Sequence, residues 1–251
     1  MGDLFVSIGE WLQKMQDKFI LDFVVDNRWR YLTTGLKNTL IVTFFAAIMG
    51  IVLGFTVATI RSAYEMNDIK NAPRTWRNFP LRFLNSICML YLTVIRGTPV
   101  VVQLMIIYFL ILGPFGWNDL TCAIIGFGIN SGAYVAEIVR GGIMSIDRGQ
   151  MEAGRSLGFN YIQTMLLIIF PQAFKTVLPS LANEFIVLLK ETSVAGYVAL
   201  HDLTKGGDII RGRTYDAFFP LIVVALIYLT MVVILEKLVS RLERRLRQSE
   251  R

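Results

Sequence analysis

The sequence has few of the residues that form metal centres, disulfide frameworks or hydrolytic sites. Its 251 residues include two cysteines and one histidine. Cys88 and Cys122 both lie in apolar stretches without a metal-binding or redox spacing, so we expect them to pack in the interior. His201 has no surrounding pattern from which a catalytic triad or a metal site could be assembled. The sequence therefore predicts no catalytic residue, no bound metal and no cofactor.

The sequence also lacks the Gly-x-x-x-x-Gly-Lys-Ser/Thr pattern, whose backbone amides hold the phosphates of a nucleotide. The chain is therefore not expected to bind ATP by that route. A net charge of +6 could suit a nucleic-acid partner, but the charges gather in a few loops and at the C-terminus. That distribution is typical of membrane topology, and we expect no nucleic-acid partner.

Apolar residues, by contrast, are abundant. Hydrophobic residues make up 54% of the chain and charged residues 18%, which leaves long runs almost without charge. A run of about 20 apolar residues can cross a bilayer as a helix. The sequence therefore predicts an all-α membrane protein with about five spans, over residues 38–60, 99–112, 120–141, 178–199 and 215–235.

Two of the apolar stretches contain breaks. In the first, a helix that is interfacial or partly buried should end at Arg96, and Thr98 should cap the span that Pro99 begins. In the second, residues 162–200 are too many for one span, and Pro171 and Pro179 interrupt them. We expect the first part of this second stretch to lie along the inner membrane surface.

The N-terminal residues 1–31 form a separate segment. Along it, apolar residues follow one another at steps of three or four with charges between them: Leu4, Ile8, Trp11, Met15 and Phe19. This spacing predicts an amphipathic helix at the membrane interface, outside the cell. Residues 32–235 then form the membrane domain, and residues 236–251 form a basic tail.

The distribution of lysine and arginine predicts the orientation. Loop 61–82 has five basic residues against two acidic ones, and the tail has six against three. The short loops at 113–119 and 200–214 are neutral or nearly so. Because basic loops stay in the cytoplasm, we expect loops 61–82 and 142–161 and the C-terminus on the cytoplasmic side, with the N-terminus outside.

Polar side chains inside the predicted spans are costly, so each is a candidate for function. The third span carries three of them on one helical face, at steps of four and three: Asn130, Tyr134 and Glu137. The fourth span carries three more: Asn183, Glu184 and Lys190. Structural roles are the alternative, because Glu137 could pair with Arg140 and Lys190 could pair within the fold. Arg96 is expected to anchor an interface or bind backbone carbonyls.

Five blocks of the sequence carry a family resemblance. In chain order they are LKNTLIVT, RGTPVVVQLMIIYF, NSGAYVAEIVRGGI, EAGRSLGF and FPQAFKTVLPSLANEFIVLLKETS, and they extend over roughly residues 32–235. Together they resemble the polar amino-acid permease family, the membrane subunits of bacterial ABC importers. EAGRSLGF resembles that family's EAA loop, with Gly154 at a position where the loop usually has alanine.

The resemblance implies a type I importer permease in the bacterial inner membrane, working as a homodimer or heterodimer. Two ATPase subunits would bind inside the cell, and an extracytoplasmic amino-acid-binding protein would bind outside. The chain itself would not be an enzyme, because ATP hydrolysis would belong to the partner. A coupling helix at about 150–158 would dock into the ATPase through Glu152, Ala153, Gly154, Ser156, Leu157 and Gly158.

An amino-acid substrate would bring an ammonium and a carboxylate into the membrane. We expect Glu184, supported by Asn130 and Asn183, to meet the ammonium, and Lys190 to face the carboxylate. These residues do not indicate which amino acid is carried. The alternative is a secondary transporter driven by an ion gradient, whose intramembrane acids would bind protons or sodium. Against this alternative, the sequence shows no inverted repeat.

Overall fold

A computed structural model of the chain describes residues 2–67, 69–71, 73, 75–76 and 78–248. Asp68, Arg74 and Arg77 of the predicted basic loop lie outside the described residues, as do residues 249–251 of the predicted tail. The side chains of residues 2–9, which include Leu4 and Ile8 of the predicted amphipathic face, also lie outside.

Every regular element in the described part of the chain is helical. The elements are α1 (Gly2–Phe19), η1 (Ile20–Val24), η2 (Val25–Asn27), α2 (Trp29–Met66), α3 (Phe79–Gly97), α4 (Val100–Ile106), η3 (Ile107–Leu112), η4 (Gly113–Phe115), α5 (Asp119–Met144), α6 (Arg148–Ser156), α7 (Tyr161–Thr164), η5 (Met165–Ile169), α8 (Phe170–Glu191), η6 (Thr192–Val198), α9 (Leu203–Thr214) and α10 (Phe218–Gln248).

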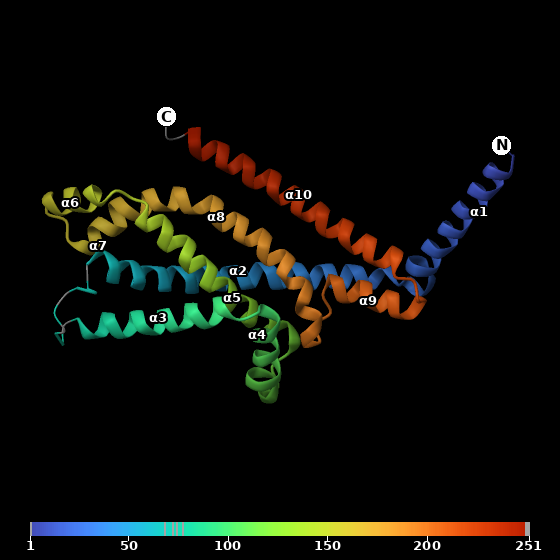
Figure 1. The fold of residues 1–251 in the computed structure, drawn as a ribbon, viewed down its shortest axis with the longest axis horizontal. Coiled ribbons are helices and arrows are strands. Elements are labelled where there is room, and N and C mark those ends of the chain that lie inside the picture. Colours follow the sequence, from blue (N-terminus) through green and yellow to red (C-terminus); the bar gives the residue numbers. More distant parts are fainter. Residues whose placement is uncertain (1, 68, 72, 74, 77, 249–251) are drawn as a thin grey trace.

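Helix α2 runs along most of the long axis of the molecule, with α3, α5 and α8 beside it (Figure 1). Helix α6 lies at one end of this axis, and α1 and α9 lie at the other (Figure 1). Small residues let α2 and α5 approach closely: a β-carbon at Gly50 would lie 3.0 Å from Cβ of Ser131, and one at Gly54 would overlap Val135. The α2–α5 pair is therefore the packed centre from which the other helices are positioned.

Within the described residues, four helical segments are long and apolar enough to cross a membrane singly, and α3 with residues 100–115 makes a fifth, bent by 111°. The prediction of about five spans agrees with this architecture. Helix α5 also matches its predicted span, 120–141, to within a few residues. Residues 2–19 form the predicted N-terminal helix, α1.

Several predicted helix ends are wrong because a change in polarity does not end a helix. The first span was predicted over residues 38–60, but helix α2 extends from Trp29 to Met66, a length of 38 residues. It continues past both predicted ends because Lys37 and Arg61 are good helix formers. At about 1.5 Å per residue it is far longer than the ~30 Å apolar core of a bilayer. The predicted domain boundary after residue 31 falls inside its first turn. Likewise, α10 continues to Gln248, so the predicted tail 236–251 begins as an extension of the last span.

The break at residues 96–99 is confirmed, but its capping was predicted wrongly. Pro99 is the N-cap of α4, and the Thr98 hydroxyl donates backward to the Val94 carbonyl at 2.8 Å instead of capping the helix. The predicted break in 162–200 is wrong as well, because residues 161–198 form one continuous helical run. The π-helical turn η5 comes directly before α8 and accommodates Pro171, which cannot donate a backbone hydrogen bond.

The start of the last span differs from the prediction by three residues. Tyr215 adopts a left-handed conformation with φ of 55°, which ends α9 instead of beginning α10. The Asp216 carboxylate then accepts a hydrogen bond from the Phe218 backbone N–H at 2.9 Å. The carboxylate stabilises one of the N–H groups that every helix start leaves without a helical partner. Helix α10 therefore begins at Phe218.

Candidate functional site

A chain of polar side chains joins α4, α5 and α8 within the membrane-spanning part. Glu184 of α8 accepts a hydrogen bond from the Ser131 hydroxyl of α5 at 3.1 Å. The neighbouring Asn130 is buried, and its amide N–H donates to the Gln103 side-chain oxygen of α4 at 3.0 Å. The structure therefore brings together Glu184 and Asn130, two of the residues predicted from the sequence. Gln103 was missed.

Gln103 is positioned by the helix break that precedes it. Pro99 has no N–H, so the Ile95 carbonyl lacks the helical donor it would otherwise have. The Gln103 amide supplies that donor at 2.7 Å and also donates to Thr98 at 2.9 Å. An amide placed four residues after a helix-breaking proline is the sequence signal that could have identified Gln103.

This arrangement fixes which way the Asn130 amide points. Because the Gln103 nitrogen is used by backbone carbonyls, its oxygen must accept, and Asn130 must turn its nitrogen toward it. The Asn130 oxygen is left buried without a hydrogen-bond partner in the described residues. Two acceptors thus lie at consecutive residues of α5: the buried oxygen of Asn130, and the Glu184 carboxylate that Ser131 holds. Both can accept hydrogen bonds from a cation, in a place where few other polar groups are found.

The remaining residues predicted on α8 do not join this chain. Asn183 and Lys190 are both exposed, and no ion pair or hydrogen bond connects either of them to Glu184 in the described residues. Six residues separate Glu184 from Lys190, which places them about 120° apart around the helix. Lys190 therefore does not face the same space as Glu184.

Glu137 lies in an ion-pair ring between α2 and α5. Its carboxylate contacts Arg61 at 2.7 Å and Arg140 at 3.0 Å, and Glu65 contacts the same two arginines at 3.2 Å each. Two positive and two negative charges therefore close a neutral ring. The pair of Glu137 with Arg140, which the sequence analysis gave as the structural alternative, is present. Such a ring replaces much of the hydration that these groups lose inside the protein.

Arg96, which the sequence analysis assigned to an interface or to carbonyls, lies outside this ring. It approaches Glu137 at 3.8 Å, and its guanidinium carbon lies 5.9 Å from the centre of the Tyr134 ring. No hydrogen bond from Arg96 to a backbone carbonyl is present in the described residues. Tyr134 is half-exposed, and its contact with Arg96 is a cation–π interaction.

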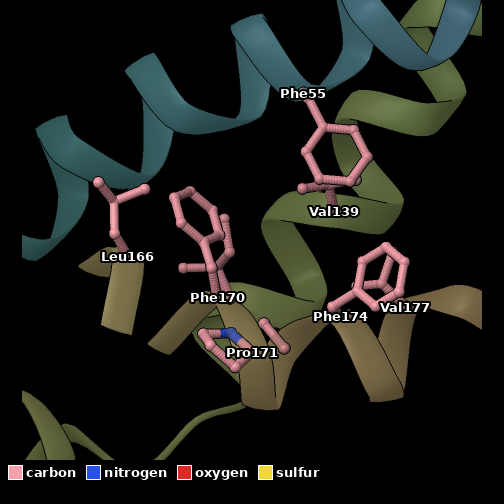
Figure 2. Close-up of a pocket in the computed structure, with 9 residues that line it drawn as sticks. Phe55, Val139, Leu166, Phe170, Pro171, Phe174 and Val177 are labelled. Carbon is pink, nitrogen blue, oxygen red and sulfur yellow. The ribbon is translucent and has the colours of Figure 1, made fainter. Parts of the chain in front are cut away.

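An apolar cavity of about 360 Å³ lies elsewhere, between α2, α5 and the start of α8. Figure 2 shows the side chains of Phe55, Phe170 and Phe174 around it. The remaining lining side chains are also hydrocarbon, and they are Val139, Ile143, Leu166, Pro171, Ala173 and Val177. Without a side-chain donor or acceptor, this cavity cannot recognise a polar solute.

At one end of the molecule, α6 is the predicted coupling helix, shifted by two residues from 150–158. It begins after Asp147, whose carboxylate accepts the Gly149 N–H at 2.6 Å, and Gly158 with φ of 89° lies just beyond its last turn. The acid at the helix start is therefore Asp147.

Gly154 attaches α6 to the rest of the protein. A β-carbon at this position would lie 2.6 Å from Cγ2 of Thr164, which is itself fully buried. The close approach explains glycine where the EAA loop usually has alanine. The other predicted docking residues, Glu152, Ala153, Ser156, Leu157 and Gly158, are all exposed, and Leu157 is 77% exposed. Helix α6 thus buries Gly154, packs Met151 partly against the core and exposes its other residues.

Comparison with known proteins places this geometry among transport components. Residues 72–248 match the family described as "Binding-protein-dependent transport system inner membrane component". The arginine transport system permease protein ArtQ of Bacillus subtilis is 35% identical over 88% of this chain and 94% of its own length. The glutamine transport system permease protein GlnP of Escherichia coli (strain K12) is 34% identical over 86% of this chain and 93% of its own length.

Solved structures agree. A crystal structure described as an amino acid ABC transporter with histidines has a TM-score of 0.74 and 38% identity, covering 88% of this chain and 97% of that one. The MetNI methionine ABC transporter, in an inward-facing conformation, has a TM-score of 0.71 over 86% of this chain and 95% of that one. At 20% identity, this second likeness shows the fold alone.

Proposed function

The chain belongs to the family of binding-protein-dependent transport system inner membrane components, and from this premise we propose that it is the permease subunit of an ATP-driven importer of polar amino acids. The fold is the all-α architecture of type I importer permeases. In the proposal, two permease subunits, identical or paralogous, enclose the path. Two ATPase subunits bind inside the cell, and an extracytoplasmic amino-acid-binding protein delivers the substrate.

The substrate class rests on the pair of acceptors beside Ser131. An α-amino acid always carries an ammonium group, and the Glu184 carboxylate and the unpartnered Asn130 oxygen suit it. The named relatives transport arginine and glutamine, which share this group and differ in their side chains. Tyr134 and Glu137 follow Asn130 along α5 and border the proposed path there. Asn183 and Lys190 of α8 remain candidates for another part of the path, since Lys190 does not face the space of Glu184.

The proposed orientation of the protein in the membrane rests on the distribution of its basic residues. In the proposal, α6 and the basic loop near residues 61–82 face the cytoplasm, and α1 and α9 lie outside. Figure 1 shows α6 at one end of the long axis and α1 and α9 at the other, which supports opposite sides for them. Helix α6 then acts as the coupling helix, because it offers an exposed surface that ends in the apolar side chain of Leu157.

The single observation that carries the ATPase partnership is the exposure of this surface on a helix that Gly154 holds against Thr164. The test is Leu157→Asp in the purified full chain, mixed with the candidate ATPase subunit. Because a Leu side chain that becomes buried contributes about 1.5–3 kcal/mol, we expect binding to weaken roughly 10- to 100-fold. Hydrolysis stimulated by the binding protein should fall in parallel.

A matched control is Tyr215→Asp, at the opposite end of the molecule. Tyr215 is 95% exposed, and aspartate tolerates its left-handed backbone. This variant should bind the ATPase like the unaltered chain. If Leu157→Asp also binds normally and uptake follows an ion gradient without ATP, the chain is instead a secondary transporter.

A further inference from the structure

A third arginine, Arg96, lies beside the ion-pair ring of α2 and α5 but is not a member of it. Arg61, Arg140, Glu65 and Glu137 pair their four charges with one another, so the charge of Arg96 has no carboxylate of its own. Its approach to Glu137 at 3.8 Å is to an oxygen that Arg140 already holds at 3.0 Å. Within the described residues the cluster therefore has an excess of one positive charge, carried by Arg96.

Arg96 faces a cavity of about 390 Å³ between α2, α3 and α5. This volume lies in the range of about 300–1,000 Å³ that small-molecule sites occupy. Arg96 is 46% exposed, whereas Arg61 is 15% exposed, so Arg96 is the accessible one. The Thr93 hydroxyl lines the same cavity, although it also donates to the Met89 carbonyl.

The chemistry of Arg96 suits an oxyanion. A guanidinium presents five N–H donors in a planar fork, and none of those of Arg96 makes a hydrogen bond in the described residues. That fork matches the two oxygens of a carboxylate or of a phosphate. An arginine held at membrane depth with its donors unused is a candidate for ligand binding.

The cavity lies on the same face of α5 as the proposed ammonium site. One face of α5 presents, at steps of four and three residues, Asn130, Tyr134 and Glu137. The guanidinium of Arg96 lies over the ring of Tyr134. Seven residues of helix separate Asn130 from Glu137 by about 10 Å. In an α-amino acid one carbon atom separates the ammonium from the carboxylate, so one molecule cannot bind both places at once. The two places are therefore successive.

We propose that Arg96 is the carboxylate-binding residue of a second station on the transport path, nearer to α6 than the Glu184 station. This inference rests on the proposed amino-acid transport and adds a residue to it. At this station the Arg96 fork binds the substrate carboxylate while Tyr134 supports the guanidinium. The phosphate of an anionic lipid has the same oxyanion chemistry and is the competing source of a ligand.

The test compares amino acids with their decarboxylated analogues. The probes are L-arginine with agmatine and L-glutamine with 4-aminobutanamide, each titrated by calorimetry into the purified permease–ATPase complex without the binding protein. Native mass spectrometry of the same samples reports bound phosphatidylglycerol. The variants are Arg96→Gln, Arg96→Lys and, as the matched control on the same helix, Arg82→Gln. Arg82 contacts the Ile69 carbonyl away from this cavity.

We expect the unaltered complex to prefer the carboxylate-bearing member of at least one pair. Arg96→Gln should reduce that preference roughly 10- to 100-fold, the effect of losing a charged hydrogen-bond pair. Arg96→Lys should retain part of it, because lysine keeps the charge and loses the fork. Arg82→Gln should retain it fully. If Arg96→Gln does not assemble, the comparison of Arg96→Lys with the unaltered complex decides.

Two results would overturn the inference alone: an unchanged preference in the Arg96 variants, or loss of phosphatidylglycerol from Arg96→Gln with unchanged amino-acid binding. Failure of the proposed function looks different, because then the unaltered complex would bind neither member of either pair.

Discussion

Two polar clusters on α5 use similar residues but differ in how completely their charges are paired. At Glu137, both carboxylate oxygens hold arginines of a closed ring. At Glu184 of α8, the Ser131 hydroxyl is the one hydrogen-bond partner within the described residues, and the neighbouring Asn130 oxygen has none there. A cluster whose charges are paired can fix helices in place, whereas a carboxylate without a cation retains capacity for a ligand. The difference separates a structural role from a binding role within one helix bundle.

The largest effect on stability is expected from Glu137→Gln. The change leaves Arg61 and Arg140 with Glu65 as their remaining partner, and removal of one member of a buried ion pair costs about 3–5 kcal/mol. Because the ring is partly accessible, we expect the lower end of this range. Thermal unfolding of the purified full chain in detergent should show the loss.

Glu184→Gln is the matched control for that experiment. It keeps a hydrogen bond to Ser131, so unfolding should change by less than about 1 kcal/mol. Amino-acid binding should instead weaken roughly tenfold or more, because a charged partner is lost. The distinction between the clusters fails if Glu137→Gln unfolds normally while losing substrate, or if Glu184→Gln is the variant that unfolds early.

A smaller effect is expected from Gln103→Leu, which removes the amide that orients Asn130. The Ile95 carbonyl would lose its donor, and the Asn130 nitrogen would lose its acceptor. Leaving such buried groups unsatisfied costs about 1–3 kcal/mol, measurable by the same thermal unfolding. Substrate binding should weaken too, because Asn130 would then be able to rotate.

Gln103→Glu separates these two effects. A protonated glutamate can still donate one hydrogen bond to the carbonyls, so it should unfold later than Gln103→Leu. If both variants bind substrate like the unaltered chain, the Asn130 oxygen is not part of the site.

The sequence predicted the residues that helical spacing brings together and missed those that depend on rotation or on backbone breaks. Asn130, Tyr134 and Glu137 share a face of α5 because their spacing is fixed by the helix itself. The sequence analysis assigned Lys190 to the carboxylate and Arg96 to an interface or to backbone carbonyls, without knowing which way either side chain faces. How α8 turns against α5 is set by tertiary packing, and no periodicity within one helix reports it.

The helix ends likewise separate into features that the sequence showed and features that depend on packing. The break at residues 96–99 was visible in a Gly-Thr-Pro string, yet its hydrogen bonding was not. Pro171 and Pro179 suggested interruptions that the structure does not have, because a π-helical turn before α8 accommodates the first of them. Whether a proline breaks a helix or is accommodated depends on the packing around it, here on Met165 and Ile169, which are buried.

A third cluster, outside the spans, extends the comparison to a site that titrates. Where α1 and η1 meet the start of α10, Lys18 pairs with Asp216 at 3.0 Å, and the buried Asp22 lies nearby. Burial raises the pKa of Asp22 above its usual 3.8, and Asp216 adds to this, whereas Thr214, Lys18 and Arg28 oppose it. The hydrogen bond from the Phe218 N–H lowers the pKa of Asp216, with a further contribution from Lys18. Here Asp22 and Asp216 both interact with Lys18, and Arg28 acts on Asp22 as well.

The two pKa shifts have opposite consequences for docking of the N-terminal segment. Asp216 stabilises the docked state above pH 3.8, and this stabilisation is lost as the pH falls through its lowered pKa. Asp22 opposes docking at neutral pH, and protonation relieves the opposition as the pH falls through its raised pKa toward 3.8. Asp22→Asn should therefore strengthen docking at pH 7 and make little difference near pH 4.

Hydrogen exchange of the amides of residues 14–19 measures this docking, provided that variant and unaltered chain are compared at each pH. We expect exchange in Asp22→Asn to be slower by a few-fold at pH 7, which is the size of a surface charge interaction of about 0.2–1 kcal/mol. Asp26→Asn is the control, because Asp26 is exposed and its ion pair within the described residues is with Arg28. A ratio that does not vary with pH would mean that Asp22 does not titrate in this range.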